Sequence, residues 1–210
     1  ANPPEKVKLD TVGPLFHGVK VKIAEDGEIL VSGENVMNGY WNDPDATSKT
    51  LIDGWVHTGD IGEFDDEDYL KITDRKKDIL VNAGGDNISP TRVEGKLDIE
   101  PEIAQSMLYG DFKNYLVAVI VPDKDFAINW AKENSKDQVL ETIVKDEDFN
   151  KVMKEVVNKV NKNLSVIEQV RKFILIDQEF TIENSMMTVS MKVRRFAVKD
   201  KYGDELEKLY

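Results

Sequence analysis

The chain has 210 residues, of which 40% are hydrophobic and 32% charged, a composition typical of a folded globular protein. Its formal net charge of −12 disfavours nucleic-acid binding, because a sequence-independent binder needs a basic surface to displace counterions from phosphate. The absence of cysteine excludes disulfides and thiolate catalysis, and two separated histidines are too few for a histidine-rich metal site. No metal site is predicted. With no signal-peptide pattern and no apolar run near the roughly 20 residues of a membrane span, we expect a cytoplasmic protein, at most peripheral to a membrane.

The first third of the chain is predicted to contain short strands joined by tight turns. Alternating apolar and polar residues indicate strands, and Asp43-Pro44 indicates a helix start, with Asp at the cap and Pro in the first turn. The predicted elements are strands at 19–23, 28–32, 55–57, 61–64 and 69–72 and a short helix at about 46–51. Residues 1–13, the entry segment at the N-terminus, are expected to be loosely held. The acidic turn 65–68 is expected to be solvated, because it lacks the ligand spacing of a calcium loop.

From residue 79 onward, strands are predicted to alternate with helices. Ser89-Pro90 is a strong helix start, and the nearly continuous apolar run Tyr115–Val121 predicts a central strand buried on both faces. Apolar residues at helical spacing between Phe149 and Val160 predict a helix that packs into the core. The remaining predicted elements are strands at 79–81, 103–109 and 173–176 and helices at about 126–132, at 138–145 and from 193 to beyond 198.

The charged stretch Thr73–Leu80 joins these two regimes, and we interpret it as a hinge between two structural units. The predicted fold class is α+β: a small strand-rich N-terminal unit, residues 1–76, followed by a compact α/β C-terminal domain, residues 77–210, with a central sheet flanked by helices. Lys76 and Lys77 lie at the predicted hinge. Taken alone, both are ordinary solvated lysines.

Asp60 and Arg75 are candidate ligand-binding residues in the first unit. Asp60 follows a predicted strand and Gly59, where a carboxylate can accept two hydrogen bonds from vicinal hydroxyls such as those of ribose. The alternative is a turn aspartate that bonds its own backbone. Arg75 offers a planar fork of donors for ribose oxygens or phosphate. Its alternative is a surface ion pair with Asp74 or Asp78.

Two further candidates lie in the second unit. Lys192 stands at the mouth of the last predicted helix beside the hydroxyls of Thr188 and Ser190, where an ammonium group can reach an anionic ligand. The alternative is an ordinary surface lysine near a chain end. The Gly84-Gly85 pair needs unusual backbone angles and marks a tight loop.

Five motifs occur in order and at compatible spacing, and together they resemble the adenylate-forming superfamily, which includes acyl-CoA synthetases, luciferases and peptide-synthetase adenylation domains. The motifs are Gly27–Val31, Asn35–Trp41, Gly54–Ile61, Asp74–Asp78 and Met191–Arg195. The finer pattern is similar to long-chain fatty acid–CoA ligases, which have paired lysines after Asp-Arg, an Ala-Gly-Gly-x-Asn-x-Ser-Pro loop and a Met-Lys-Val-Arg-Arg ending. The resemblance extends from about Thr11 to Tyr202.

The resemblance implies a two-step reaction with ATP, Mg and CoA. A fatty-acid carboxylate attacks the α-phosphate of ATP to give an acyl-adenylate and pyrophosphate. The small C-terminal domain then rotates about the hinge, and the CoA thiol displaces AMP. The implied partners are therefore the fatty acid, ATP, CoA and the missing N-terminal domain of the same chain.

The same resemblance implies roles for individual residues. Asp60 and Arg75 should hold the ribose hydroxyls of the nucleotide. Lys192 should bridge the substrate carboxylate and the phosphate and stabilise charge that develops in the first step. Lys77 falls at the hinge position of the family. The Gly84-Gly85 loop should face the CoA channel in the second step.

Some features depart from the family pattern. Val189 stands where the family usually has Pro, and Val81 stands where luciferase-like members carry a lysine. The phosphate loop and Tyr-Gly-x-Thr-Glu motif of the large N-terminal domain are absent. We therefore expect a C-terminal fragment without turnover of its own and with apolar surface left bare.

Two alternatives remain open. The first is an adenylation domain that loads a carboxylic or amino acid onto a carrier protein, and the second is a binding module without catalysis. The long helical insertion at 126–164 and the Lys-Val-Arg-Arg ending favour the ligase.

Overall fold

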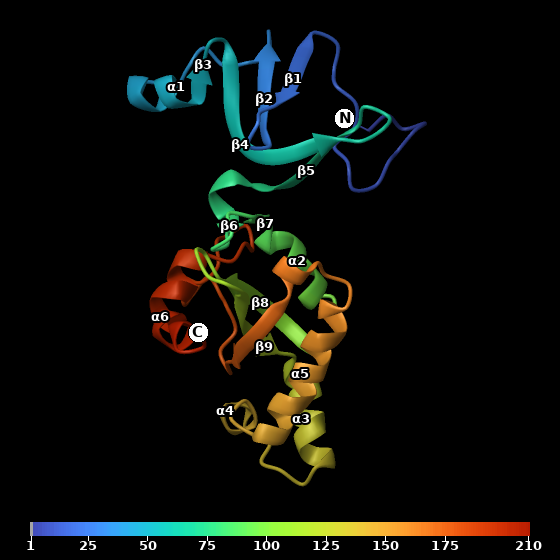
Figure 1. Cartoon of the computed structure of the whole chain (residues 1–210), viewed down its shortest axis with the longest axis vertical. Coiled ribbons are helices and arrows are strands. Elements are labelled where there is room, and N and C mark those ends of the chain that lie inside the picture. The colour runs from blue at the N-terminus through green and yellow to red at the C-terminus, as the bar shows by residue number, and fades with distance from the viewer. Residues whose placement is uncertain (1) are drawn as a thin grey trace. The chain divides into compact units, whose positions relative to one another are not determined.

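A computed structural model describes residues 2–210, which form two compact units. The first unit ends at Ile79 and the second runs from Leu80 to Tyr210 (Figure 1). The division falls inside the predicted hinge stretch, a few residues beyond the predicted boundary at 76/77. Helices and strands are both abundant, and the α+β class is confirmed.

The first unit is built on one antiparallel sheet. Its strands are β1 (Val19–Ile23), β2 (Glu28–Gly33), β3 (Leu51–Ile52), β4 (Trp55–Phe64) and β5 (Leu70–Arg75). The order is β1-β2-β4-β3, and β5 also pairs with β4. The helix α1 (Pro44–Thr50) begins as predicted, because the Asp43 side chain accepts a hydrogen bond from the amide of Ala46 at 2.9 Å.

One prediction for this sheet is wrong in detail. Residues 55–57 and 61–64 are not two strands separated by a loop, because β4 continues through Thr58-Gly59-Asp60 as one strand. Gly59 has a φ of +71° and lies where the pairing between β2 and β4 is irregular. A glycine that signals a turn in the sequence therefore forms an irregularity within a strand.

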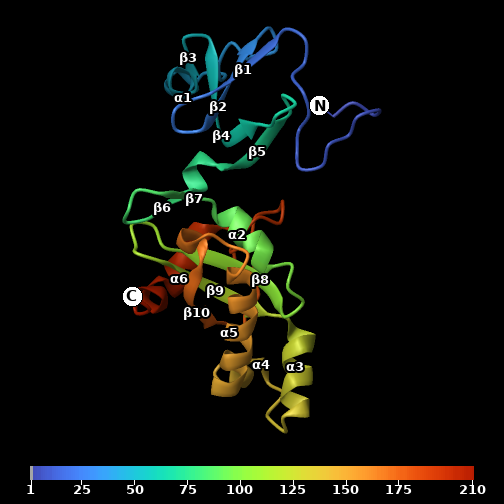
Figure 2. The same ribbon diagram turned by 45° about the vertical axis from the view of Figure 1, so that its right-hand side comes forward.

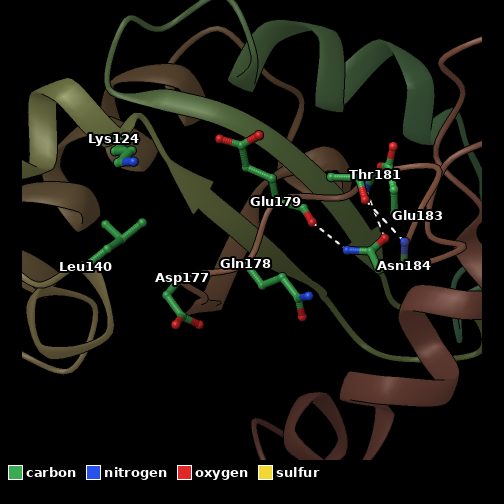
Figure 3. A pocket seen from close by; sticks show the side chains of 8 residues that line it. All are labelled: Lys124, Leu140, Asp177, Gln178, Glu179, Thr181, Glu183 and Asn184. Carbon is green, nitrogen blue, oxygen red and sulfur yellow. Dashed lines mark hydrogen bonds between the residues drawn. The ribbon is translucent and has the colours of Figure 1, made fainter.

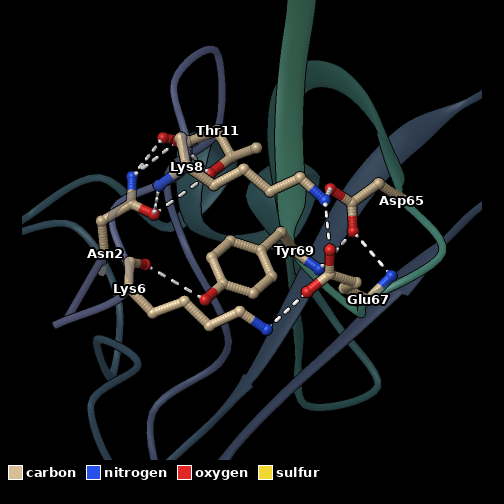
Figure 4. A network of polar contacts seen from close by, with 7 residues as sticks. All are labelled: Asn2, Lys6, Lys8, Thr11, Asp65, Glu67 and Tyr69. Atoms are coloured by element: carbon tan, nitrogen blue, oxygen red, sulfur yellow. Dashed lines mark hydrogen bonds and ion pairs between the residues drawn. The ribbon is translucent and has the colours of Figure 1, made fainter.

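The entry segment is also held more firmly than predicted. The amide of Val12 donates to the carbonyl of Leu70 at 2.8 Å, and the amide of Leu70 donates to the carbonyl of Gly13 at 3.1 Å. Figure 4 shows Lys6 beside Glu67 and Tyr69 at the acidic turn. These bonds satisfy backbone groups of β5 that would otherwise lack partners, which local composition does not reveal.

Some large apolar side chains of the first unit face solvent. Trp41 is 92% exposed, and Leu9 and Phe16 are exposed as well. Within residues 2–210, no helix combines the length and apolar character needed to cross a bilayer.

The second unit has a three-stranded sheet in the order β10-β9-β8. Its strands are β8 (Ile103–Tyr109), β9 (Leu116–Pro122) and β10 (Val170–Leu175). The strand β9 is antiparallel to β8 and parallel to β10. The chain crosses from β9 to β10 through α3 (Lys124–Glu133), α4 (Leu140–Ile143) and α5 (Glu147–Asn161). The helices α2 (Pro90–Leu97) and α6 (Arg195–Glu207) complete the unit, with the small pair β6 (Leu80–Val81) and β7 (Asn87–Ile88).

Alternate residues of β9 enter two different cores, and every residue of this strand is buried. Leu116, Ala118 and Ile120 pack with residues of α2 and α5, whereas Val117, Val119 and Val121 pack with residues of α6. The views in Figures 1 and 2 agree that these helices lie on opposite sides of the sheet. The prediction of a central strand buried on both faces is confirmed.

Candidate functional site

Asp60 and Arg75 lie side by side in the first unit. Antiparallel pairing makes them direct partners across β4 and β5, which places their side chains on the same face. Arg75 Nε lies 2.8 Å from Asp60 Oδ1, and 52% of the Arg75 side chain and 22% of the Asp60 side chain remain exposed. The pair is therefore accessible to a ligand.

This geometry differs from both of the simpler expectations. Asp60 lies within a strand and its carboxylate pairs with an arginine, so it is not a turn aspartate that merely bonds its own backbone. The Arg75 guanidinium pairs with Asp60 across the sheet, while the buried Asp74 uses Oδ1 to accept a hydrogen bond from the Arg75 amide at 2.7 Å.

A buried glutamate supports this region, and sequence reasoning assigned it no role. The Glu28 side chain is only 5% exposed. Its Oε1 accepts a hydrogen bond from the Gly59 amide at 2.9 Å, and its Oε2 lies 2.9 Å from Lys76 Nζ and 3.0 Å from His57 Nδ1. Burial acts to raise the pKa of Glu28, but the bonds from Lys76, His57 and Gly59 outweigh it and lower that pKa. The only sequence signal was its place in the motif Gly27–Val31.

The Lys76 side chain is 47% exposed, as expected of a solvated lysine, but its ammonium is paired with two carboxylates. Its Nζ lies 2.6 Å from Asp26 Oδ2 in addition to its contact with Glu28. Hydrogen bonds to Asp26 and then to Glu28 raise the pKa of Lys76. Lys77 is exposed and makes no side-chain hydrogen bond or ion pair within the part of the chain that the structure describes. Residues 76–78 form one 3-10 turn, with the Ile79 amide donating to the Arg75 carbonyl at 3.2 Å.

Lys192 belongs to the second unit and lies in a tight loop. The Thr188 amide donates to the Lys192 carbonyl at 2.9 Å, and the Lys192 amide donates to Thr188 Oγ1 at 3.1 Å. Met191 has a φ of +59°, and Val189, where the family usually has Pro, is 86% exposed. The Lys192 side chain is exposed and pairs with no carboxylate within residues 2–210.

A second ion pair, not anticipated from the sequence, fixes the end of this loop. Arg195 Nη1 donates to Glu94 Oε1 at 2.6 Å and its Nη2 donates to Glu94 Oε2 at 2.5 Å. Glu94 Oε1 also accepts a hydrogen bond from the buried Leu108 amide at 2.6 Å. The first residue of α6 is thereby tied to α2 and β8, which fixes the backbone three residues after Lys192.

The Gly84-Gly85 loop is a compact turn organised by Asn82. Asn82 Oδ1 accepts hydrogen bonds from the amides of Gly84 and Asp86, each at 2.9 Å. Gly85 has a φ of +87°, a conformation that favours glycine, whereas Gly84 does not have a positive φ. The expected unusual backbone is therefore found at Gly85 alone.

A hollow of about 630 Å³ lies elsewhere in the second unit (Figure 3). Its lining combines Lys124 and Leu140 with the segment that follows β10, including Asp177, Glu179 and Glu183. None of the predicted site residues lines it. Across residues 2–210, no group of three or more His, Asp or Glu side chains is placed to hold a metal ion.

Comparisons with known proteins agree on one family. The family model described as AMP-binding enzyme C-terminal domain matches residues 77–210. Long-chain-fatty-acid–CoA ligase FadD15 of Mycobacterium tuberculosis is 36% identical over 206 residues, which cover 97% of this chain and 34% of that protein. Human long-chain-fatty-acid–CoA ligase 1 is 33% identical over 189 residues, covering 88% of this chain and 27% of that protein. The chain thus spans about a third of the length of these curated relatives.

Solved structures show the same fold. The adenylation domain of a carboxylate reductase from Mycobacterium chelonae has a TM-score of 0.77 at 24% identity, covering 95% of this chain and 31% of that one. The O-succinylbenzoate coenzyme A synthetase of Bacillus subtilis, in complex with AMP, has a TM-score of 0.62 at 26% identity, covering 92% of this chain and 36% of that one.

Proposed function

This chain belongs to the adenylate-forming AMP-binding enzymes, and we propose that it is the C-terminal portion of an ATP-dependent long-chain fatty acid–CoA ligase. The observation that carries the proposal is the match to a fatty-acid–CoA ligase over 97% of the chain. The cross-strand pair of Asp60 and Arg75, accessible to a ligand, supports it.

In the proposed reaction, the fatty-acid carboxylate attacks the α-phosphate of ATP, the bond to the β-phosphate oxygen breaks, and pyrophosphate leaves. The CoA thiolate sulfur then attacks the acyl carbon of the adenylate, and AMP leaves with the bonding electrons. Mg accompanies ATP as part of the substrate. No residue of this chain is proposed to coordinate it.

Asp60 and Arg75 are proposed to bind the ribose of the nucleotide. A carboxylate accepts hydrogen bonds from two vicinal hydroxyls, and the guanidinium donates to ribose oxygens or phosphate. Their ion pair supports this role, because each group orients the other before the nucleotide arrives.

Lys192 is proposed to be the catalytic residue of the first step. An ammonium group near the α-phosphate stabilises the charge that develops as the carboxylate attacks. Its exposed position in a tight loop suits a group that must approach a ligand and then withdraw. Withdrawal requires rotation of the C-terminal domain, for which Lys77 is the proposed hinge, and the same rotation would bring the Gly84-Gly85 loop to the CoA channel.

A second candidate function is an adenylation domain that transfers its acyl group to a carrier protein. The fold similarity to a carboxylate reductase adenylation domain is compatible with it. The two functions differ in the acceptor of the second step. The intact enzyme should consume acyl-adenylate with free CoA if it is a ligase, but only with a carrier protein if it is not.

The test of the proposed function replaces Lys192 in the full-length enzyme. We expect Lys192→Ala to slow acyl-adenylate formation roughly 100- to 1,000-fold, as for loss of one preorganised electrostatic group. CoA-dependent consumption of preformed acyl-adenylate should stay within about twofold of the wild type, because Lys192 is withdrawn in that step. Each half-reaction is followed separately by release of pyrophosphate or AMP.

The matched control is Lys154→Ala, which removes an exposed lysine of α5 and should leave both half-reactions unchanged. Equal loss of both half-reactions in Lys192→Ala would contradict the role assigned to this residue. An inactive wild-type enzyme with fatty acids, ATP and CoA would overturn the ligase itself.

A further inference from the structure

We propose that Glu28 is a positioning residue that holds the stationary end of the hinge and the nucleotide-binding strand with one buried carboxylate. The inference deepens the proposed function and rests on it. It concerns contacts within the first unit only.

The carboxylate of Glu28 joins three segments that are distant in sequence. Oε1 accepts the Gly59 amide of β4 at 2.9 Å, and Oε2 lies 2.9 Å from the ammonium of Lys76, the residue that follows β5. Glu28 itself starts β2. Both oxygens therefore serve as acceptors. One accepts a hydrogen bond from β4, and the other accepts one from the residue that follows β5.

Burial and charge make this carboxylate a firm anchor. The Glu28 side chain is only 5% exposed, and the Lys76 ammonium lies between it and Asp26, whose Oδ2 is 2.6 Å away. Hydrogen bonds between ionised groups are shorter and stronger than those between neutral ones. A buried carboxylate would be costly without such partners, so the arrangement favours a fixed Lys76.

The anchors stand directly beside the proposed nucleotide-binding pair. Gly59 precedes Asp60, and Lys76 follows Arg75. Lys77, one residue further, has no side-chain hydrogen bond or ion pair within the described chain. A rotation that begins at Lys77 therefore leaves Arg75 in place, because Lys76 is held to the same unit.

Without the anchor, the rotation would extend back to Arg75 and disturb the ribose contact. The predicted signature is a change in KM for ATP that exceeds any change in kcat. A residue needed only for folding would instead lower kcat through loss of active enzyme and leave KM unchanged.

The test uses four variants of the full-length enzyme: Glu28→Gln, Lys76→Met, Lys76→Arg and the control Lys20→Met, an exposed lysine of β1. We expect Lys76→Met and Glu28→Gln to raise the KM for ATP roughly 3- to 10-fold. This is the effect expected from losing one charged hydrogen bond whose strength is reduced by solvent screening. Lys76→Arg should restore the wild-type KM, and Lys20→Met should match the wild type.

Amide hydrogen exchange on the 210-residue chain tests the anchoring contacts of Glu28 independently of enzyme activity. Exchange at Gly59 should be several-fold faster in Glu28→Gln than in the wild type or Lys20→Met, because a neutral amide oxygen accepts the Gly59 bond less strongly than a carboxylate oxygen. Unchanged exchange at Gly59 in Glu28→Gln would overturn the proposal.

The kinetic outcomes separate the two hypotheses. An active wild type whose KM for ATP is unchanged in Lys76→Met would overturn the positioning role and leave the ligase standing. A fall in kcat alone, without rescue by Lys76→Arg, would also overturn it. If the wild type forms no acyl-adenylate, the proposed function is wrong. The exchange experiment alone then decides whether Glu28 anchors Gly59.

Discussion

Asp60 and Arg75 show how strand pairing creates a possible site from residues of ordinary type. The two residues are far apart in the sequence, and each is of a charged type that is usually found on protein surfaces. Antiparallel pairing of β4 with β5 nevertheless makes them cross-strand neighbours with a 2.8 Å ion pair. Their residue types and motifs could be found in the sequence, but their contact depends on which residue of one strand faces which residue of the other.

Replacing Asp60 tests the proposed ribose contact. In the full-length enzyme, Asp60→Ala should raise the KM for ATP roughly 10- to 100-fold, because it removes a charged acceptor and the carboxylate that pairs with Arg75. Steady-state kinetics at varied ATP measure the effect. Glu63→Ala is the control, because Glu63 is an exposed carboxylate of the same strand. An unchanged KM for ATP in Asp60→Ala would exclude the assigned role.

At the level of elements, the acidic turn between β4 and β5 holds the entry segment. The turn was predicted to be solvated, and its residues 66–68 are exposed. Asp65 and Glu67, however, pair with lysines of the entry segment: Lys8 Nζ lies 2.7 Å from Asp65 Oδ2 and Lys6 Nζ lies 2.5 Å from Glu67 Oε2 (Figure 4). Asp65 Oδ1 also accepts the amides of Glu67 and Tyr69.

These contacts predict that acid releases the entry segment. Pairing with Lys8, reinforced by the amides of Tyr69 and Glu67, lowers the pKa of Asp65 from 3.8 to about 2. Because the folded pKa is depressed, the stabilisation is complete above the unfolded value and is lost as the pH falls through the folded one. Amide resonances of Val12 and Leu70 should therefore shift as the pH falls from about 4 to about 2.

Asp65→Asn should weaken the same contacts at pH 7, and the exposed Asp66→Asn serves as its control. If the two variants behave alike at neutral pH, the Asp65 contacts do not hold the segment.

For the whole molecule, the division into two units predicts separable folding. Both hydrophobic cores around β9 are composed of residues from the second unit, so burial of their apolar surface does not require the first. The proposed mechanism requires a domain that can rotate as a body, and such independence is compatible with it.

The segment 80–210 expressed alone should therefore fold. We expect a cooperative thermal unfolding transition and a dispersed amide spectrum in which residues of β8 and β9 keep the chemical shifts of the whole chain. Phe149→Ala, which empties a fully buried position, should destabilise this segment by about 3–5 kcal/mol. A segment without dispersed resonances would show that its core depends on the rest of the chain.

The sequence alone determined the features that depend on local order. A nearly continuous apolar run predicted the strand buried on both faces, and the Asp43-Pro44 and Ser89-Pro90 pairs predicted two helix starts. Five motifs in order carried the resemblance to the family. Tertiary structure decided the continuity of β4, the attachment of the entry segment and the cluster around Glu28. The physical reason is that these features depend on contacts between residues far apart in the chain, and a carboxylate or a glycine has the same local preferences whether such a partner is present or not.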